Sequence, residues 1–214
     1  MIKLKQFAFN PLQVNLYLLY EEGGSGILID PSALEASELA RLDGFVKEHS
    51  ISLELVLATH GHFDHLFGAG SIRDRYHTRF MIHPADAALA NIAPQQASVF
   101  GLRFTTPVPE PEGFLEDGQE IRAGSIVLRV IHVPGHSPGC VAFYEATQGW
   151  LFAGDTLFSG SIGRTDLPGG DFDQIIESIR TRLFLLPDET RVFPGHGLAS
   201  SIGKEKLTNP YVGG

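Results

Sequence analysis

Short apolar runs and helical spacing divide the chain into two groups of strands with helices between them. In the first half, strands are predicted at residues 14–20, 26–29, 53–58 and 80–82. The first two flank a Gly-rich segment at 21–25, a pattern typical of a hairpin. Helices are predicted at residues 35–49, 68–77 and 84–90, with Ser32 as the N-cap of the first and Pro84 opening the last.

The second half repeats this alternation after a polar interruption. Residues 91–113 are rich in Pro, Gln, Ser and Thr, and we expect a long surface excursion there, either a lid or an inert loop. Strands are predicted at residues 126–133, 141–145, 150–153 and 191–193. An amphipathic helix over 171–186 begins at Asp171, a good cap, and the chain ends in a polar tail. Two clusters of strands with intervening helices predict an α/β fold of layered sheets covered by helices.

Composition narrows the class of protein. With 214 residues, 43% of them hydrophobic and 19% charged, the chain fits one ordinary globular domain. A net charge of −9 makes nucleic acid a poor partner, so a small-molecule substrate is expected. The N-terminus lacks the features of a signal peptide and no apolar run is long enough for a membrane span, so we expect a cytoplasmic protein. The sequence does not indicate an oligomeric state.

A cluster of histidines supplies the first candidate chemistry. His60, His62 and His65 fall within six residues together with Asp64, directly after a predicted buried strand. Imidazole nitrogens and carboxylate oxygens are the usual ligands of zinc and its neighbours. A Gly-containing turn lets His60 and His62 point one way while Asp64 and His65 point another, so one segment can serve two adjacent metals.

Three later residues repeat this arrangement. His136, Asp155 and His196 each follow a predicted strand and a glycine. Each alone is compatible with an ordinary turn, but polar residues presented by several strand ends are typical of an active site on a rigid scaffold. Together with the first cluster they provide enough ligands for two metals.

This order of motifs resembles the metallo-β-lactamase-fold superfamily over about residues 14–197. The resemblance implies a four-layer αββα sandwich with the metals at one edge between the sheets. It implies a first metal site of His60, His62 and His136, and a second of Asp64, His65 and His196. Asp155 matches the bridging carboxylate.

The resemblance also implies a mechanism. Two divalent ions about 3.5–4 Å apart lower the pKa of a shared water toward about 7, and the resulting hydroxide attacks a carbonyl. Asp64 is the candidate catalytic residue because it can orient this hydroxide as well as bind metal. Zinc is the first expectation for both ions, with iron and manganese as alternatives.

The bridging aspartate selects a branch of the superfamily. The sequence Gly154-Asp155-Thr156 and the segment 163–171 resemble short bacterial glyoxalase II-like proteins, whereas zinc β-lactamases carry cysteine at the bridge. We therefore expect a hydrolase of thioesters of the S-lactoylglutathione type. Residues 1–214 are expected to be a single catalytic domain without the C-terminal helical domain of full-length glyoxalase II, which leaves Arg164 as the candidate substrate contact; a structural salt bridge is its alternative role.

Two other activities fit the same motifs. An iron-dependent persulfide dioxygenase resembles this chain strongly, including a Gly-Arg-Thr-Asp segment, and a lactonase on the same scaffold is also compatible.

The remaining candidates have structural interpretations. Cys140, the one cysteine, excludes an intramolecular disulfide and is expected to be buried packing. Ser137 and Thr156 either orient metal ligands or cap turns. The other histidines are not expected to bind metal; they are His49, His77, His83 and His132.

Overall fold

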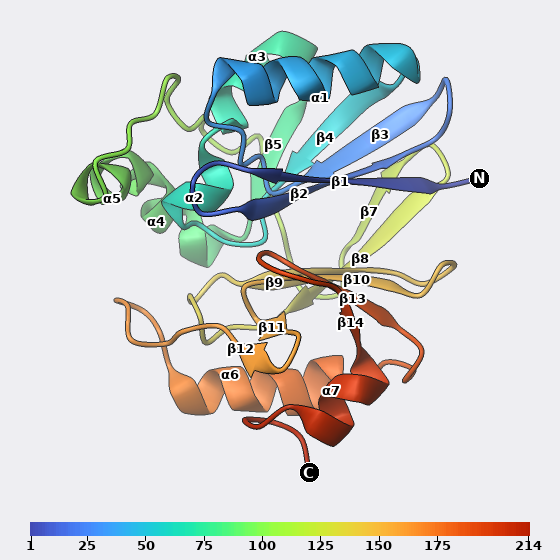
Figure 1. Ribbon diagram of the computed structural model, residues 1–214, viewed down its shortest axis with the longest axis vertical. Coiled ribbons are helices and arrows are strands. Elements are labelled where there is room, and N and C mark those ends of the chain that lie inside the picture. The colour runs from blue at the N-terminus through green and yellow to red at the C-terminus, as the bar shows by residue number, and fades with distance from the viewer.

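Two six-stranded β-sheets pack face to face in the computed structural model, which describes residues 1–214 (Figure 1). The first sheet contains, in spatial order, β1 (Lys3–Phe9), β2 (Val14–Tyr20), β3 (Ser25–Ile29), β4 (Ser52–Leu57), β5 (Arg79–Ile82) and β6 (Gly113–Phe114). The second contains β14 (Ser200–Ser201), β13 (Arg191–Pro194), β10 (Trp150–Gly154), β9 (Val141–Glu145), β8 (Ile126–His132) and β7 (Glu120–Ala123). A separate hairpin joins β11 (Leu157–Phe158) to β12 (Ser161–Ile162).

Helices cover the outer face of each sheet, and further helices of the first half lie at one end of the sandwich (Figure 1). Those of the first half are α1 (Ala36–Glu48), α2 (Phe63–Leu66), α3 (Ala69–Tyr76), the 3₁₀ turn η1 (Pro84–Asp86), α4 (Ala87–Asn91) and α5 (Ala93–Val99). Those of the second half are α6 (Phe172–Ser178), the π-helical turn η2 (Ile179–Leu183) and α7 (Ile202–Thr208). None of these helices combines the length and the apolar character that crossing a membrane would require.

Side-chain alternation along the buried strands generates three hydrophobic layers. In β2, Leu16 and Leu18 pack toward α1, while Tyr17 and Leu19 face the second sheet, because successive strand residues point to opposite faces. A third layer lies between the second sheet and the helices α6 and α7, where Ile175 packs in the same cluster as strand residues of β10. The fold is therefore the predicted four-layer αββα sandwich.

Most of the predicted strands and helices are confirmed, and the main difference in the first helix is the residue that caps its N-terminus. The hairpin of β2 and β3 forms, with Tyr17 opposite Ile29. The prediction of Ser32 as the N-cap of α1 is wrong. Glu35 caps the helix in a capping box with Glu38, and Ser32 is fully buried upstream of it.

Only part of the segment 91–113 is the long surface loop that its composition predicted. Helix α5 occupies its first part, and Ala93 and Ala97 are fully buried against the same cluster as Phe63. Pro94 lies in the first turn of α5, where its missing N–H has no helical partner to lose. The remainder, residues 100–112, contains no helix or strand.

The end of the chain is more ordered than predicted. The expected polar tail contains α7, whose N-cap Ser201 accepts a hydrogen bond from the backbone of Lys204 and whose Ile202 is buried. The predicted cap at Asp171 is confirmed, because its Oδ1 accepts from Gln174 N at 2.9 Å. The predicted helix 171–186 is divided into α6 and η2.

Candidate metal centre

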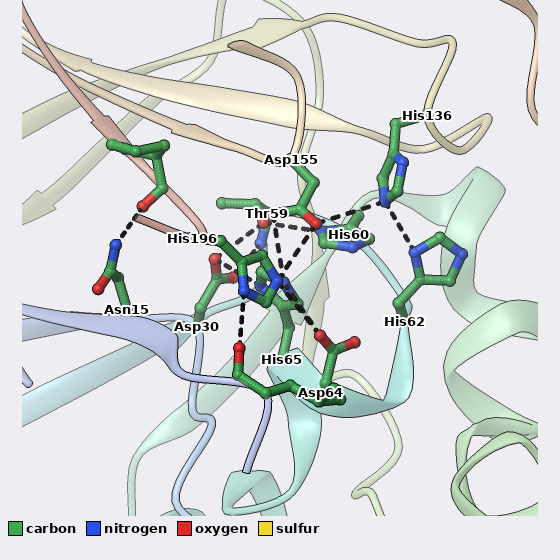
Figure 2. Close-up of polar contacts among 12 residues, drawn as sticks. Asn15, Asp30, Thr59, His60, His62, Asp64, His65, His136, Asp155 and His196 are labelled. Atoms are coloured by element: carbon green, nitrogen blue, oxygen red, sulfur yellow. Dashed lines mark hydrogen bonds and ion pairs between the residues drawn. The ribbon is translucent and has the colours of Figure 1, made fainter. Parts of the chain in front are cut away.

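Four strand ends bring the predicted ligands together at one edge of the two sheets. β4 leads into the loop and the short helix α2 that together carry the histidine cluster, and β8 leads into the loop of His136. β10 and β13 pair in parallel, so their carboxyl ends meet at the same edge and place Asp155 beside His196. Figure 2 shows the seven predicted side chains converging on one region.

His60, His62 and His136 form the first group. Their ligand atoms all lie within 4.8 Å of one another, and Nδ1 of His62 is 2.9 Å from Nε2 of His136. Nδ1 of His136 lies 2.7 Å from the carbonyl oxygen of Arg164, to which it donates a hydrogen bond. This contact on Nδ1 orients the ring so that Nε2 of His136 faces His62.

Asp64, His65 and His196 form the second group, again with ligand atoms within 4.8 Å of one another. Nε2 of His196 lies 3.4 Å from Oδ2 of Asp64, while its Nδ1 donates to the carbonyl oxygen of Leu12 at 3.0 Å. Nε2 of His65 lies 3.8 Å from the same carboxylate oxygen.

Asp155 lies between the two groups. Its Oδ1 is 3.4 Å from Nε2 of His65, and its Oδ2 is 3.5 Å from Nε2 of His196. The same Oδ2 lies 3.7 Å from Nε2 of His136 in the first group. One carboxylate thus reaches histidines of both groups.

Buried polar atoms without partners indicate that this cluster fits metal ions. Three of the eight buried side-chain nitrogen and oxygen atoms without a hydrogen-bond partner are Nε2 of His60, Nε2 of His65 and Oδ1 of Asp155. Unsatisfied buried polar atoms are rare in folded proteins and call for an explanation. All three belong to the predicted ligand set, and imidazole and carboxylate are the donors that zinc, iron and manganese accept.

For His60, His62 and Asp155 the electrostatics point in the same direction, whereas burial is outweighed by the nearby carboxylates at His65 and His196, which raise the pKa of both imidazoles. Burial and the neighbouring histidines lower the pKa of His60 well below its ordinary value, and burial and His136 lower the pKa of His62 to about 4. The imidazoles of His60 and His62 are therefore neutral at pH 7, as metal ligation requires. Burial opposes ionisation of Asp155, but the nearby His65 holds the pKa of this carboxyl below its usual range, so it is ionised.

The ligand loops are held by residues that sequence reasoning missed. Asp30 accepts from Thr59 N at 2.8 Å and lies 3.0 Å from Nδ1 of His65. Asn15 donates through Nδ2 to the carbonyl oxygens of Pro194 and Gly197 on either side of His196, at 3.0 Å each. A third missed residue, Asp86, is fully buried beside two ligand loops. Asp30 had a usable signal, because it directly follows an apolar strand just as Asp155 does.

The candidate substrate residue Arg164 lies at the border of the cluster. Its backbone carbonyl binds His136, whereas its guanidinium is exposed and forms two hydrogen bonds of 2.7 Å with Asp166. The structure thus contains the salt bridge that was predicted from the sequence as the alternative role of Arg164.

The other singled-out residues do not join the ligand groups. The hydroxyl of Ser137 donates to Asp86 at 2.6 Å, and Thr156 is buried with an unpartnered hydroxyl. Cys140 is buried, and burial raises the pKa of its thiol, in keeping with the predicted packing role. None of the remaining histidines shares a metal-ligand group; they are His49, His77, His83 and His132.

Comparison with known proteins agrees with this geometry. Residues 9–196 match the metallo-beta-lactamase superfamily, and the chain belongs to that superfamily. A curated relative from Haemophilus influenzae, hydroxyacylglutathione hydrolase GloC, is 34% identical over 94% of this chain and 93% of its own length.

Two solved structures share the whole fold. BLEG-1 B3 metallo-beta-lactamase has a TM-score of 0.89 and 32% identity, covering 99% of this chain and all of its own. TTHA1623 in a di-iron-bound form has a TM-score of 0.86 and 38% identity, covering 97% of this chain and 99% of its own. The family and the cluster of histidines and aspartates together indicate a metal-dependent hydrolase fold that holds divalent metals.

Proposed function

We propose that the protein is a binuclear metal-dependent hydrolase that cleaves acyl thioesters of the S-lactoylglutathione type. His60, His62 and His136 would hold one metal, Asp64, His65 and His196 the other, and Asp155 would bridge them. The observation that carries the proposal is the position of Asp155, whose two oxygens lie within 3.4–3.7 Å of histidines in both groups.

Two divalent ions bound there would lower the pKa of a shared water toward about 7 and supply hydroxide for attack on a carbonyl. The protein's part is to fix the geometry around that water. Asp64, with a side chain only 13% exposed, lies beside His65 and His196 and presents a carboxylate that can orient the attacking nucleophile. The bond from His136 to the Arg164 carbonyl and the contact of His196 with the Leu12 carbonyl fix both rings from behind.

The substrate class is supported by the bridging residue and by one relative. By the resemblance, Asp155 stands where the best-known zinc β-lactamases carry cysteine, and the relative GloC, at 34% identity, is described as a hydroxyacylglutathione hydrolase. Arg164 extends an exposed guanidinium from the loop that contacts His136, which suits a contact with an anionic substrate group.

The test is thioester hydrolysis by protein loaded separately with zinc, iron and manganese. S-lactoylglutathione, other glutathione thioesters and an acyl-coenzyme A thioester form the panel, with release of free thiol as the signal. We expect turnover of at least one glutathione thioester, and loss of that turnover in His62→Ala. A fully metal-loaded protein that releases no thiol from any member of the panel would overturn the proposal.

The same preparations distinguish the alternative activities. The similarity to TTHA1623, seen with two irons, makes the iron-loaded form the one to test for oxygen consumption with glutathione persulfide. The similarity to BLEG-1 calls for a β-lactam, and a simple lactone completes the set. Faster turnover of any of these than of thioesters would replace the proposed substrate class.

A further inference from the structure

A buried carboxylate outside the ligand set, Asp86, connects the two loops that carry the first histidine group. Asp86 ends η1 and is fully buried. Its Oδ2 accepts a hydrogen bond from the N–H of Gly61 at 2.8 Å, and its Oδ1 accepts from the N–H of Gly139 at 2.6 Å. The hydroxyl of Ser137 donates to Oδ2 at 2.6 Å. Gly61 lies between two ligands, and Ser137 directly follows a third.

Both loops approach Asp86 so closely that only glycine fits at the contact. A Cβ on Gly139 would lie 2.6 Å from Cβ and Cγ of Asp86, and a Cβ on Gly61 would lie 2.8 Å from its backbone oxygen. Neither contact can be relieved by moving the end of a flexible side chain. Gly139 therefore allows the close approach to the side chain of Asp86, and Gly61 allows the close approach to the backbone that carries it.

The charge of Asp86 has no cationic side chain beside it. None of the ion pairs of the protein includes Asp86, and its three donors are neutral N–H and O–H groups. A buried ionised carboxylate is costly without a compensating positive charge. The two adjacent ligand loops supply three imidazoles, and an imidazole binds a metal as a neutral ligand. The positive charge of a cation bound there would therefore be balanced within the site only by the shared Asp155. A cation held by these loops would complement the buried negative charge.

We propose that Asp86 is the positioning residue of the His60–His62–His136 site. It holds the two loops so that Nδ1 of His62 and Nε2 of His136 face each other at 2.9 Å, and its charge favours a cation at that position. This inference rests on the proposed metal ligands, but it adds a residue that binds neither metal nor substrate.

Asp86 acts on the first group alone because other residues hold the second. Asp30 contacts His65, and the amide of Asn10 donates to the carbonyl oxygen of Asp64 at 2.9 Å. No hydrogen bond joins Asp86 to the segment 63–66 or to His196. A change at Asp86 should therefore weaken one metal position and leave the other, which a general loss of stability would not do.

The experiment uses Asp86→Asn and a matched control, Glu205→Gln. Asparagine keeps the volume of Asp86 but has one acceptor oxygen, so its amide NH₂ must face at least one donor. Glu205 is another fully buried carboxylate; it accepts from Gly160 N at 2.9 Å, from Asn209 and from Ser200, and it contacts no ligand loop. Both variants lose part of a buried hydrogen-bond network, but only the first does so beside the metal ligands.

Cobalt(II) is the probe, and its occupancy is measured at each position by anomalous diffraction from crystals equilibrated at limiting metal. Solution titrations followed by cobalt absorption give the binding constants. For Asp86→Asn we expect affinity at the His60–His62–His136 position to fall about 10–100-fold, with the other position retained. Glu205→Gln should match wild type at both positions even when its melting temperature falls.

The outcomes separate this inference from the proposed function. Wild-type protein that binds no cobalt at these residues overturns both. Wild-type binding with unchanged or equally reduced occupancy at both positions in Asp86→Asn overturns the role of Asp86 alone. Should Asp86→Asn fail to fold, Ser137→Ala serves instead, because it removes one hydrogen-bond donor to the same carboxylate. We expect a smaller loss of cobalt affinity at the His60–His62–His136 position. Unchanged affinity there would contradict the proposal.

Discussion

Nδ1 of His65 lies 3.0 Å from Oδ2 of Asp30, and both side chains are almost completely buried. The same carboxylate accepts from the backbone N–H of Thr59 at 2.8 Å and from its hydroxyl at 3.0 Å. A hydrogen bond on Nδ1 fixes the orientation of the ring and directs Nε2 of His65 into the cluster. Asp30 thus orients a ligand from behind while also fixing the start of the histidine loop.

Replacing Asp30 by Asn should weaken metal binding. The variant keeps the side-chain volume but loses one acceptor oxygen, so His65 or Thr59 is left without its partner. We expect zinc affinity and kcat/KM to fall about 10–100-fold. Competition titration with a chelator measures the first quantity, and thioester hydrolysis measures the second. The control is Asp188→Asn, which removes an exposed ion pair with Lys206. Equal zinc affinities in both variants would refute this role of Asp30.

Replacing Asp155 by Asn should separate the two metal positions. The amide keeps one oxygen but carries no negative charge, so it would bridge two metal cations far less well than the carboxylate of Asp155. We predict that metal content falls from two ions to one per chain and that kcat falls at least about 100-fold. Elemental analysis after gel filtration measures the metal. Retention of two ions with full activity would show that Asp155 is not the bridge.

Much of this centre could be predicted from the sequence because each ligand follows an apolar strand and a turn. His136, Asp155 and His196 carry that local signal, and the parallel pairing of β10 with β13 then brings two of them together. Asp86 has no such signal. Its three donors come from residues 25 to 53 positions away, so only the folded chain reveals its contacts.

The errors in the fold have similar causes. Ser32 has the right residue type for an N-cap, but the chain after Asp30 turns inward and Asn10 binds the backbone oxygen of Ser32, so the helix starts later. Helix α5 was missed because its polar composition hides two buried alanines, Ala93 and Ala97. Tertiary packing decides such short elements more than their own propensity does.

Replacing Arg164 by Ala should affect substrate binding more than the chemical step. If the guanidinium binds an anionic part of the thioester equally in ground and transition states, KM rises about tenfold while kcat is unchanged. Arg122→Ala is the matched control, since Arg122 forms a similar exposed pair with a carboxylate two residues away. Steady-state kinetics with both variants decides the point. An unchanged KM in Arg164→Ala would show that Arg164 does not bind the substrate and forms only its salt bridge.

The tyrosine hydroxyl beneath the His196 loop should contribute measurably to stability. Tyr17 is buried in the layer between the sheets and donates to the carbonyl oxygen of Pro194 at 2.7 Å. Tyr17→Phe should lower the free energy of unfolding by about 1 kcal/mol and the melting temperature by about 2–4 °C. Tyr20→Phe is the control, because the hydroxyl of Tyr20 makes no hydrogen bond within the protein. Equal melting temperatures for the two variants would contradict this contribution.

A two-metal site built from both groups of ligands can be tested by counting the metal ions bound to each chain. Protein stripped with a chelator is reloaded with zinc or iron, freed of excess metal by gel filtration, and analysed for metal per chain. We predict two ions per chain in the wild type and fewer in both His62→Ala and His196→Ala, each of which removes a ligand from a different group. A wild-type chain that retains no metal, or variants that retain as much as the wild type, would contradict it.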